Sequence, residues 1–282
     1  MASRLNKLLA DNRKAAARKF EVLAKQDSNE AEIFLYDAIV SSQEEADWYG
    51  GVAPEAFVKA VRGIDAGTIH LRINSPGGSP VQAGMINDEI VRLRAKYDKP
   101  IYAVVEETCA SAAYYIAAAA DEIYVDKASI VGSIGVLMDG FGFTGTMEKL
   151  GVERRLLTAG SNKGFLDPFS PQSEQQREYA QVMLDQIHQQ FIEVVKKGRG
   201  ERLKIADDTF SGLFWTGQQA VDMGLADRLG SLDYVAREVV KAEDVIDYTR
   251  RENVAERLAK RFGAAVGAGA VRALPLAAPQ LR

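Results

Sequence analysis

Cysteine and histidine are scarce in this 282-residue chain, and their scarcity excludes several kinds of chemistry. The single cysteine, Cys109, cannot form an intramolecular disulfide or a CxxC zinc site, and such cysteine usage suits a reducing compartment. Only two histidines, His70 and His188, are available for imidazole chemistry. A structural zinc site is therefore excluded, and any catalytic histidine must be one of these two.

The chain also lacks an excess of positive charge, a long apolar run and a secretory signal. Its 35 Lys and Arg residues against 39 Asp and Glu give a formal charge of -4, so we expect no nucleic-acid ligand. The longest apolar run, residues 109–120, falls short of the roughly 18 to 20 residues that span a bilayer. Residues 11–14, which read DNRK, interrupt any N-terminal signal sequence. The sequence thus predicts a cytoplasmic protein without a transmembrane segment.

Apolar residues make up 47% of the chain, enough to bury the core of one large domain or two small ones. We expect a basic amphipathic extension over residues 1–27, a main domain over 28–249, and a C-terminal helix with an Ala/Gly-rich tail over 250–282. Residues 4–25 carry seven Lys or Arg and two acidic residues at a helical spacing. This helix either rests on the main domain as a solvated extension, which its thin apolar stripe favours, or contacts a partner or the surface of the inner membrane.

Strands and helices alternate along the main domain, which predicts an α/β fold with a parallel sheet and right-handed crossovers. The helix over 173–197 is expected to begin at an N-cap, Ser173, and to end at Gly198 and Gly200. Further strands are expected at 31–40, 68–74, 101–105, 122–125, 154–157 and 245–248, and further helices at 54–66, 81–97, 111–120, 143–150 and 232–241, with a short one within 215–230.

The motif Asn-Ser-Pro-Gly-Gly at residues 74–78 follows a buried strand. Its paired glycines leave backbone N–H groups open to a ligand, as an oxyanion hole or a phosphate loop requires. A turn after a strand often contains Pro and Gly for geometry alone, so this motif by itself decides nothing.

A second segment, residues 108–115 (TCASAAYY), turns abruptly from a strand into a helix of small residues. A hydroxyl at this junction lies in the positive field of a helix N-terminus, which favours an alkoxide and a developing oxyanion. Ser111 is therefore a candidate nucleophile, although a serine at this position also commonly serves as an N-cap. Cys109 is expected to be a small buried residue, because it precedes the helix.

A nucleophilic Ser111 needs a base. His70 lies within a strand and His188 in the middle of a long helix, so both are expected to be structural. A loop after another expected strand places one lysine, Lys163, among small and apolar neighbours. A lysine acts as a base only if desolvation lowers its pKa well below about 10.4. We therefore expect Asp167 to point away from Lys163, since an ion pair would oppose that shift.

Together these segments resemble the signal peptide peptidase A family, whose members are serine peptidases with a Ser/Lys dyad on a Clp protease/crotonase-like fold. The turn at residues 110–115 is similar to the family's ASGGYY motif. Lys163 follows Ser111 by 52 residues, which is the spacing found in the family, and lies within an AGxxKxxxxP-like loop. Residues 132–136 match its GSIGV strand, and the resemblance extends over residues 68–229 in this order and spacing.

The resemblance implies repeated ββα units and acyl transfer to water, with no metal and no organic cofactor. In this scheme Lys163 takes the proton of Ser111, and Ser133 hydrogen-bonds the lysine. The N–H groups of Gly78 and Ala112 stabilise the tetrahedral oxyanion. The family further implies a homo-oligomeric ring, in which the lysine of one subunit completes the site of its neighbour. The substrates implied are signal-peptide remnants and other short or unfolded peptides.

The sequence departs from the family at residues 112–113, where two alanines replace a glycine pair and narrow the space beside the turn. Residues 31–53 resemble Clp-related phage head maturation proteases, which leaves a prophage capsid protease as an alternative. A crotonase-like acyl-CoA enzyme with the same fold, and a non-catalytic scaffold that docks through residues 4–25, are further alternatives. A Ser-His-Asp Clp protease is disfavoured, because its histidine is expected where this chain has Val136.

Overall fold

The computed structural model describes residues 23–24, 30–42, 44–46, 51–53, 57–58, 68–97, 100–231 and 234–239. The chain divides into two compact units, Met1–Glu243 and Asp244–Arg282, and all described residues belong to the first. Several expectations lie outside the described residues, namely the strand at 245–248, the tail at 250–282 and most of the basic extension at 1–27. The expected helix at 54–66 is described only at residues 57–58, which are helical.

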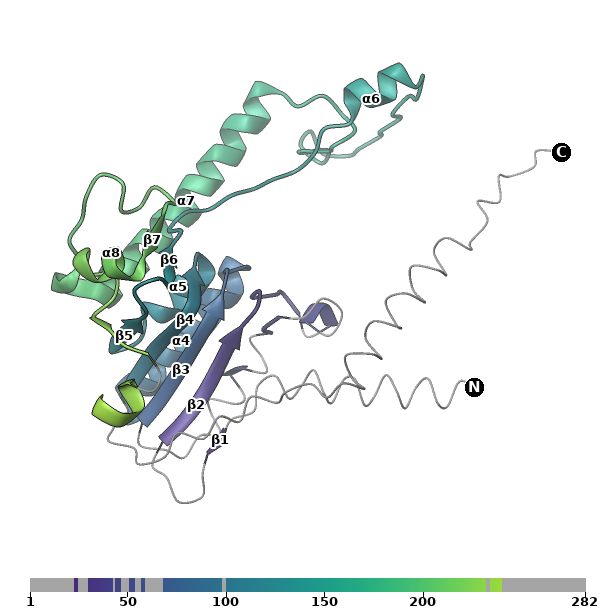
Figure 1. Cartoon of the computed structure of the whole chain (residues 1–282). Coiled ribbons are helices and arrows are strands. Elements are labelled where there is room, and N and C mark those ends of the chain that lie inside the picture. The colour runs from purple at the N-terminus through teal and green to yellow at the C-terminus, as the bar shows by residue number, and fades with distance from the viewer. Residues whose placement is uncertain are drawn as a thin grey trace, which may run out of the picture. The chain divides into compact units, whose positions relative to one another are not determined.

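One mixed sheet forms the centre of the described fold (Figure 1). Its strands are β1 (Leu23–Ala24), β2 (Glu30–Tyr36), β3 (Thr68–Ser75), β4 (Ile101–Ala110), β5 (Glu122–Val125), β6 (Ile130–Gly132), β7 (Phe214–Thr216) and β8 (Arg228–Leu229). Their order is β1-β2-β3-β4-β5-β8, with β6 paired to β4 and β7 to β6. Every described pairing is parallel except β1 with β2 and β6 with β7. The predicted α/β fold with a parallel sheet is confirmed.

The helices of the described part follow the strands in sequence. They are α4 (Pro80–Tyr97), α5 (Ala112–Ala117), α6 (Thr144–Lys149), α7 (Glu174–Arg199) and α8 (Gly217–Asp222), together with a 3-10 turn η2 (Gly200–Arg202) and a π-helical turn η3 (Val235–Val239). The first two, α4 and α5, contact each other beside the sheet, and α7 in turn contacts α5 (Figure 1).

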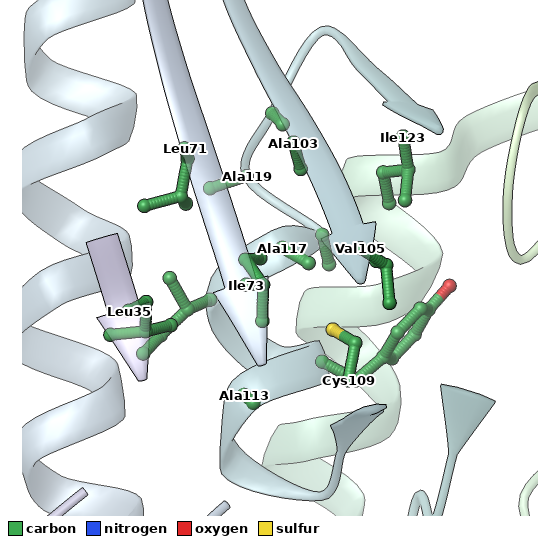
Figure 2. Close-up of a cluster of buried hydrophobic side chains, with 14 of the residues drawn as sticks. Leu35, Leu71, Ile73, Ala103, Val105, Cys109, Ala113, Ala117, Ala119 and Ile123 are labelled. Atoms are coloured by element: carbon green, nitrogen blue, oxygen red, sulfur yellow. The ribbon is translucent and has the colours of Figure 1, made fainter. Parts of the chain in front are cut away.

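The core lies between the sheet and the helices (Figure 2). Ile73 of β3 and Val105 of β4 lie on the side of the sheet that meets Ala113 and Ala117 of α5, and all four side chains are at most 2% exposed. Because alanine projects only one methyl group, α5 lies close to the sheet. This close packing fixes the start of α5 relative to the end of β4.

Helix α7 begins where the sequence predicts and ends later. Ser173 Oγ accepts from the Gln176 N–H at 3.2 Å, and Gln176 Oε1 accepts from the Ser173 N–H at 3.2 Å, which is a capping box. The expectation that Gly198 ends the helix is wrong, because α7 continues through it and stops before Gly200, whose φ is 55°. A Cβ on Gly198 would lie 2.0 Å from the carbonyl oxygen of Ala118, so this glycine permits close packing of the helices.

Strand β4 is longer than the expected 101–105 and contains a bulge. Ile73 pairs with Val105, and the next pair is Ser75 with Cys109, so β3 advances by two residues while β4 advances by four. The hydroxyl of Ser129 donates to the carbonyl of Glu106 at 2.6 Å, within the bulged segment. Beyond the bulge β4 pairs with β6 instead of β5. The bulge therefore directs the end of β4 towards β6.

Three expected elements differ from the structure. Residues 154–157 form no strand and are exposed, because no described strand lies beside them to pair with their backbone. The first long strand ends at Tyr36 instead of residue 40, since Asp37 adopts a φ of 65°. Leu23–Ala24 pair with β2 as a short strand, although the helix expected over 4–25 includes them.

Candidate active site

Ser111 lies between β4 and α5 in a backbone conformation that serine rarely adopts, with φ 53° and ψ -125°. Its N–H donates to the carbonyl of Gly132 at 2.8 Å, and its carbonyl accepts from the N–H of Tyr115 at 3.0 Å. Although Ser111 occupies the N-cap position of α5, its side chain makes no capping hydrogen bond. The hydroxyl is therefore not used to cap the helix and remains available for chemistry.

The two glycines of the motif at 74–78 form the neighbouring wall of this turn. A Cβ on Gly77, whose φ is 103°, would lie 2.8 Å from Ser111 Cβ and 2.9 Å from Ala112 N. A Cβ on Gly78, whose φ is 149°, would lie 2.1 Å from the carbonyl oxygen of Ile39. Only glycine fits at either position, and Gly77 packs directly on the serine turn.

Two backbone N–H groups beside Ser111 have no acceptor among the described residues. Ile39 bridges the glycine loop through its N–H to the carbonyl of Gly77 and through its carbonyl to the N–H of Ser79, which leaves the N–H of Gly78 unused. The N–H of Ala112 opens α5 and is likewise unused. These are the two N–H groups that the sequence predicts for an oxyanion hole.

Ser133 directly follows β6, the strand that pairs with the end of β4. Because Ala110 pairs with Gly132 in parallel register, Ser111 and Ser133 both follow directly after paired residues. Ser133 has the same unusual φ of 53°, and its N–H donates to the carbonyl of Leu213 at 2.8 Å. The backbone register thus places Ser133 alongside Ser111.

Lys163 is exposed and lies in the turn at residues 160–166, where its N–H donates to the carbonyl of Gly160 at 3.1 Å. Within the described part of the chain, its ammonium group has no hydrogen bond and no ion pair. In particular, no hydrogen bond joins it to Ser111 or Ser133. The structure of one chain therefore assembles the serine, the two N–H groups and Ser133, and leaves the lysine apart.

Asp167 is engaged away from Lys163, as expected. Its carboxylate accepts from Ser170 Oγ at 2.7 Å, from Arg154 Nε at 3.3 Å and from the N–H of Phe169 at 3.4 Å. The hydroxyl of Ser170, followed by the other two donors, lowers the pKa of Asp167. The carboxylate of Asp167 thus binds partners other than Lys163.

The segment at residues 137–172, here called the arm, connects β6 to α7 and carries Lys163. Its Phe143 ring stacks on Phe169 with 5.4 Å between centroids, and Phe165 contacts Tyr179 of α7 at 5.6 Å. Large apolar side chains of the arm that are at least 49% exposed are Leu137, Met138, Phe141, Leu150, Val152 and Leu157. An apolar surface of this extent is typical of a protein–protein contact.

His70 and Cys109 are core residues, as expected. His70 is 4% exposed and stacks on Tyr102 with 5.8 Å between ring centroids, and burial lowers its pKa to about 4. Cys109 is fully buried, and burial raises the pKa of its thiol. Neither residue competes with Ser111 as nucleophile or serves as its base.

Gly132 is a site residue that sequence reasoning did not single out. A Cβ there would lie 2.8 Å from Trp215 Cδ1 and 3.0 Å from the carbonyl oxygen of Leu213, and its φ is 112°. Its own carbonyl holds the N–H of Ser111. The glycine in the GSIGV match was the only available signal, because its neighbours in β7 are distant in sequence.

These features define an α/β protein with a serine at a strand-to-helix turn and two backbone N–H groups without an acceptor, an arrangement suited to acyl transfer. A family model described as "Peptidase family S49" matches residues 94–246 of this chain. The chain is a member of this family. The resemblance to the signal peptide peptidase A family is thereby confirmed.

Three similar proteins carry different names. The chain is 47% identical over 174 residues to a Brucella melitensis protein named Na(+)/H(+) antiporter NhaA, a match that covers 62% of this chain and 24% of that protein. It is 32% identical over 194 residues to a putative signal peptide peptidase SppA of Enterococcus faecium, covering 69% of this chain and 52% of that protein. It is 34% identical over 161 residues to capsid assembly protease C of Escherichia phage lambda, covering 57% of this chain and 36% of that protein.

The match thus covers less than two thirds of each of these relatives. In the part of this chain that the structure describes, no helix combines the length and the apolar character needed to cross a membrane.

Proposed function

We propose that this protein is a serine endopeptidase in which Ser111 is the nucleophile and Lys163 the general base. The observation that carries the proposal is the serine turn itself. The hydroxyl of Ser111 is unused, its backbone is held at a φ of 53°, and the N–H groups of Gly78 and Ala112 beside it are free. Strained turns with unused donors are typical of sites that stabilise a developing charge.

The reaction follows from these groups. The neutral amine of Lys163 takes the proton of Ser111 Oγ, and the oxygen attacks a peptide carbonyl. The N–H groups of Gly78 and Ala112 stabilise the resulting oxyanion. The lysine then gives its proton to the leaving amine. Water, deprotonated by the same lysine, attacks the acyl group, and the lysine returns that proton to Ser111 Oγ as the acyl–oxygen bond breaks. The hydroxyl of Ser133 would hold the lysine amine in place.

A second copy of this chain is proposed to supply the lysine. Lys163 is exposed and has no hydrogen bond to Ser111 within one chain, and the arm that carries it exposes apolar side chains. Burial of the arm against a neighbour would both cover this surface and remove water from around the lysine amine. A ring of such contacts would enclose the sites, so short or unfolded peptides, including signal-peptide remnants, are the proposed substrates.

A phage-type capsid protease is the second candidate function. It is favoured by the match to capsid assembly protease C of phage lambda, and by the resemblance of residues 31–53 to head maturation proteases. Both candidates use the same catalytic residues and differ only in the protein that is cut.

The test is covalent labelling with a fluorophosphonate probe, with the adduct mapped by mass spectrometry. We expect labelling at Ser111 that is lost in Ser111→Ala and in Lys163→Ala. The exposed residues Ser161 and Lys149 offer matched controls, and Ser161→Ala and Lys149→Ala should label as the wild type does.

Mixing the two inactive variants separates a shared site from one contained in a single chain. If the lysine comes from a neighbour, mixed oligomers of Ser111→Ala and Lys163→Ala regain labelling at Ser111. Labelling at another residue, or full labelling without Lys163, would refute the dyad and bring the acyl-CoA enzyme and scaffold alternatives forward.

A further inference from the structure

His188 lies in the middle of α7, and its Nε2 is 2.9 Å from the carbonyl oxygen of Ile134. Since a carbonyl only accepts, the ring must carry a proton on Nε2 and donate it. Ile134 is fully buried, and no other donor to its carbonyl exists among the described residues. Without His188 this carbonyl would be buried and unpaired, which proteins rarely tolerate.

The segment that His188 holds is a tight turn in a strained conformation. Ser133 has a φ of 53°, its N–H donates to Leu213, and its carbonyl accepts from the N–H of Gly135 at 2.9 Å. A residue other than glycine keeps such a φ only where surrounding contacts over-determine it. The hydrogen bonds of Ser133 join backbone groups, whereas the bond from His188 to Ile134 comes from a side chain.

The same turn begins at the residue that anchors the nucleophile. Gly132 pairs with Ala110, and its carbonyl accepts the N–H of Ser111 at 2.8 Å. Ser133 follows immediately, and Ile134 comes next. A displacement of the Ile134 carbonyl therefore moves Ser133 directly and reaches the anchor of Ser111 one residue further on.

We propose that His188 is a positioning residue for acyl transfer at Ser111. By holding the carbonyl of Ile134, it keeps the turn at Ser133 in the conformation that the site requires. His188 donates one hydrogen bond and transfers no proton. The inference rests on the proposed function, because it takes Ser111 as the nucleophile.

Three variants separate positioning from simple packing. His188→Ala removes the donor, whereas His188→Gln places an amide N–H at a similar reach and restores it. Gln189→Ala changes the adjacent, exposed residue of the same helix and serves as the control. Each full-length variant is compared with the wild type for its rate of fluorophosphonate labelling at Ser111, its melting temperature, and hydrogen exchange of the peptide covering residues 130–136.

We expect His188→Ala to slow labelling by about tenfold or more, as loss of a buried hydrogen bond at a site predicts, and to speed exchange at 130–136. His188→Gln should recover most of the labelling rate and of the protection, and Gln189→Ala should match the wild type. A pattern of this kind supports positioning, because packing alone would not be rescued by glutamine.

Two results would overturn the inference. The first is that His188→Ala is labelled as fast as the wild type at a temperature where both proteins are folded, even if the melting temperature of the variant is lower. The other is unchanged exchange at 130–136. If the wild type itself is not labelled at Ser111, the proposed function fails and this inference with it, so the two failures are distinguishable.

Discussion

Replacement of Gly77 by alanine is expected to disable the serine turn without replacing any group that reacts. Gly77 has a φ of 103°, and its added Cβ would lie 2.8 Å from both Ser111 Cβ and the carbonyl oxygen of Ala110. Both of these atoms, and Ala112 N at 2.9 Å, belong to the backbone or to a Cβ, which no side-chain rotation can move. The turn must therefore shift as a whole.

The magnitude follows from two costs. Holding alanine at this φ costs about 1 to 3 kcal/mol, and overpacking of the contact adds about 1 to 3 kcal/mol. The expected loss in the free energy of unfolding is thus about 2 to 6 kcal/mol, against a usual total of about 5 to 15 kcal/mol. To reach the ordinary contact distance of 3.4 Å, the atoms 2.8 Å from the new Cβ must move by about 0.6 Å. A misplacement of about 1 Å slows a reaction by about 100-fold.

Gly84 provides the matched control, because it is a helical glycine in α4 whose Cβ would meet only the Tyr115 hydroxyl oxygen, at 3.9 Å. Gly84→Ala should stabilise the protein by about 0.5 to 1 kcal/mol and label normally. Urea unfolding and the labelling rate at Ser111 are measured for both variants. A Gly77→Ala protein with wild-type stability and a wild-type labelling rate would refute this account of the turn.

Three further variants test the packing that supports the site. Asp227→Ala should cost about 3 to 5 kcal/mol in urea unfolding, because it leaves the fully buried Arg199, 2.9 Å away, without its counter-ion. Burial raises the pKa of Asp227, but the hydrogen bond and charge of Arg199 outweigh burial and lower the pKa overall. The stabilisation is therefore present at neutral pH and is lost as the pH falls below about 4. The difference in unfolding free energy between wild type and variant must shrink at such low pH. Gly198→Ala should force α7 away from the Ala118 carbonyl, which a Cβ would approach to 2.0 Å, and lower the melting temperature; an unchanged value would contradict this packing. Ser173→Ala should cost about 0.5 to 2 kcal/mol by removing the capping box of α7, and an equal loss in Gln176→Ala would support the reciprocal bond.

Local patterns allowed several elements to be predicted from the sequence. The strand at 122–125 and the helix beginning after Ser173 lie where expected, because side-chain periodicity and the cap are properties of neighbouring residues. The spacing of Ser111, Lys163 and the GSIGV match identified the family for the same reason, since motif order is contained in the chain itself. The structure then brought Ser133 and Gly78 to the serine turn.

Other features depended on contacts between segments distant in sequence. The residues expected to form a strand at 154–157 pair with none of the described strands, and Gly198, expected to end α7, is a point of close approach to Ala118. A strand exists only where a neighbour pairs with its backbone, and a glycine's role depends on what lies against it.

The sequence by itself determined the fold class and the family, and it singled out a candidate nucleophile with its candidate base. Only the tertiary structure decided that Ser111 is held at a φ of 53°, that Gly77 packs on it, and that His188 hydrogen-bonds the carbonyl of Ile134. The physical reason is that residue type and spacing are local properties. Strain, unused N–H groups and close contacts arise only when β4, its bulge and the helices are packed together.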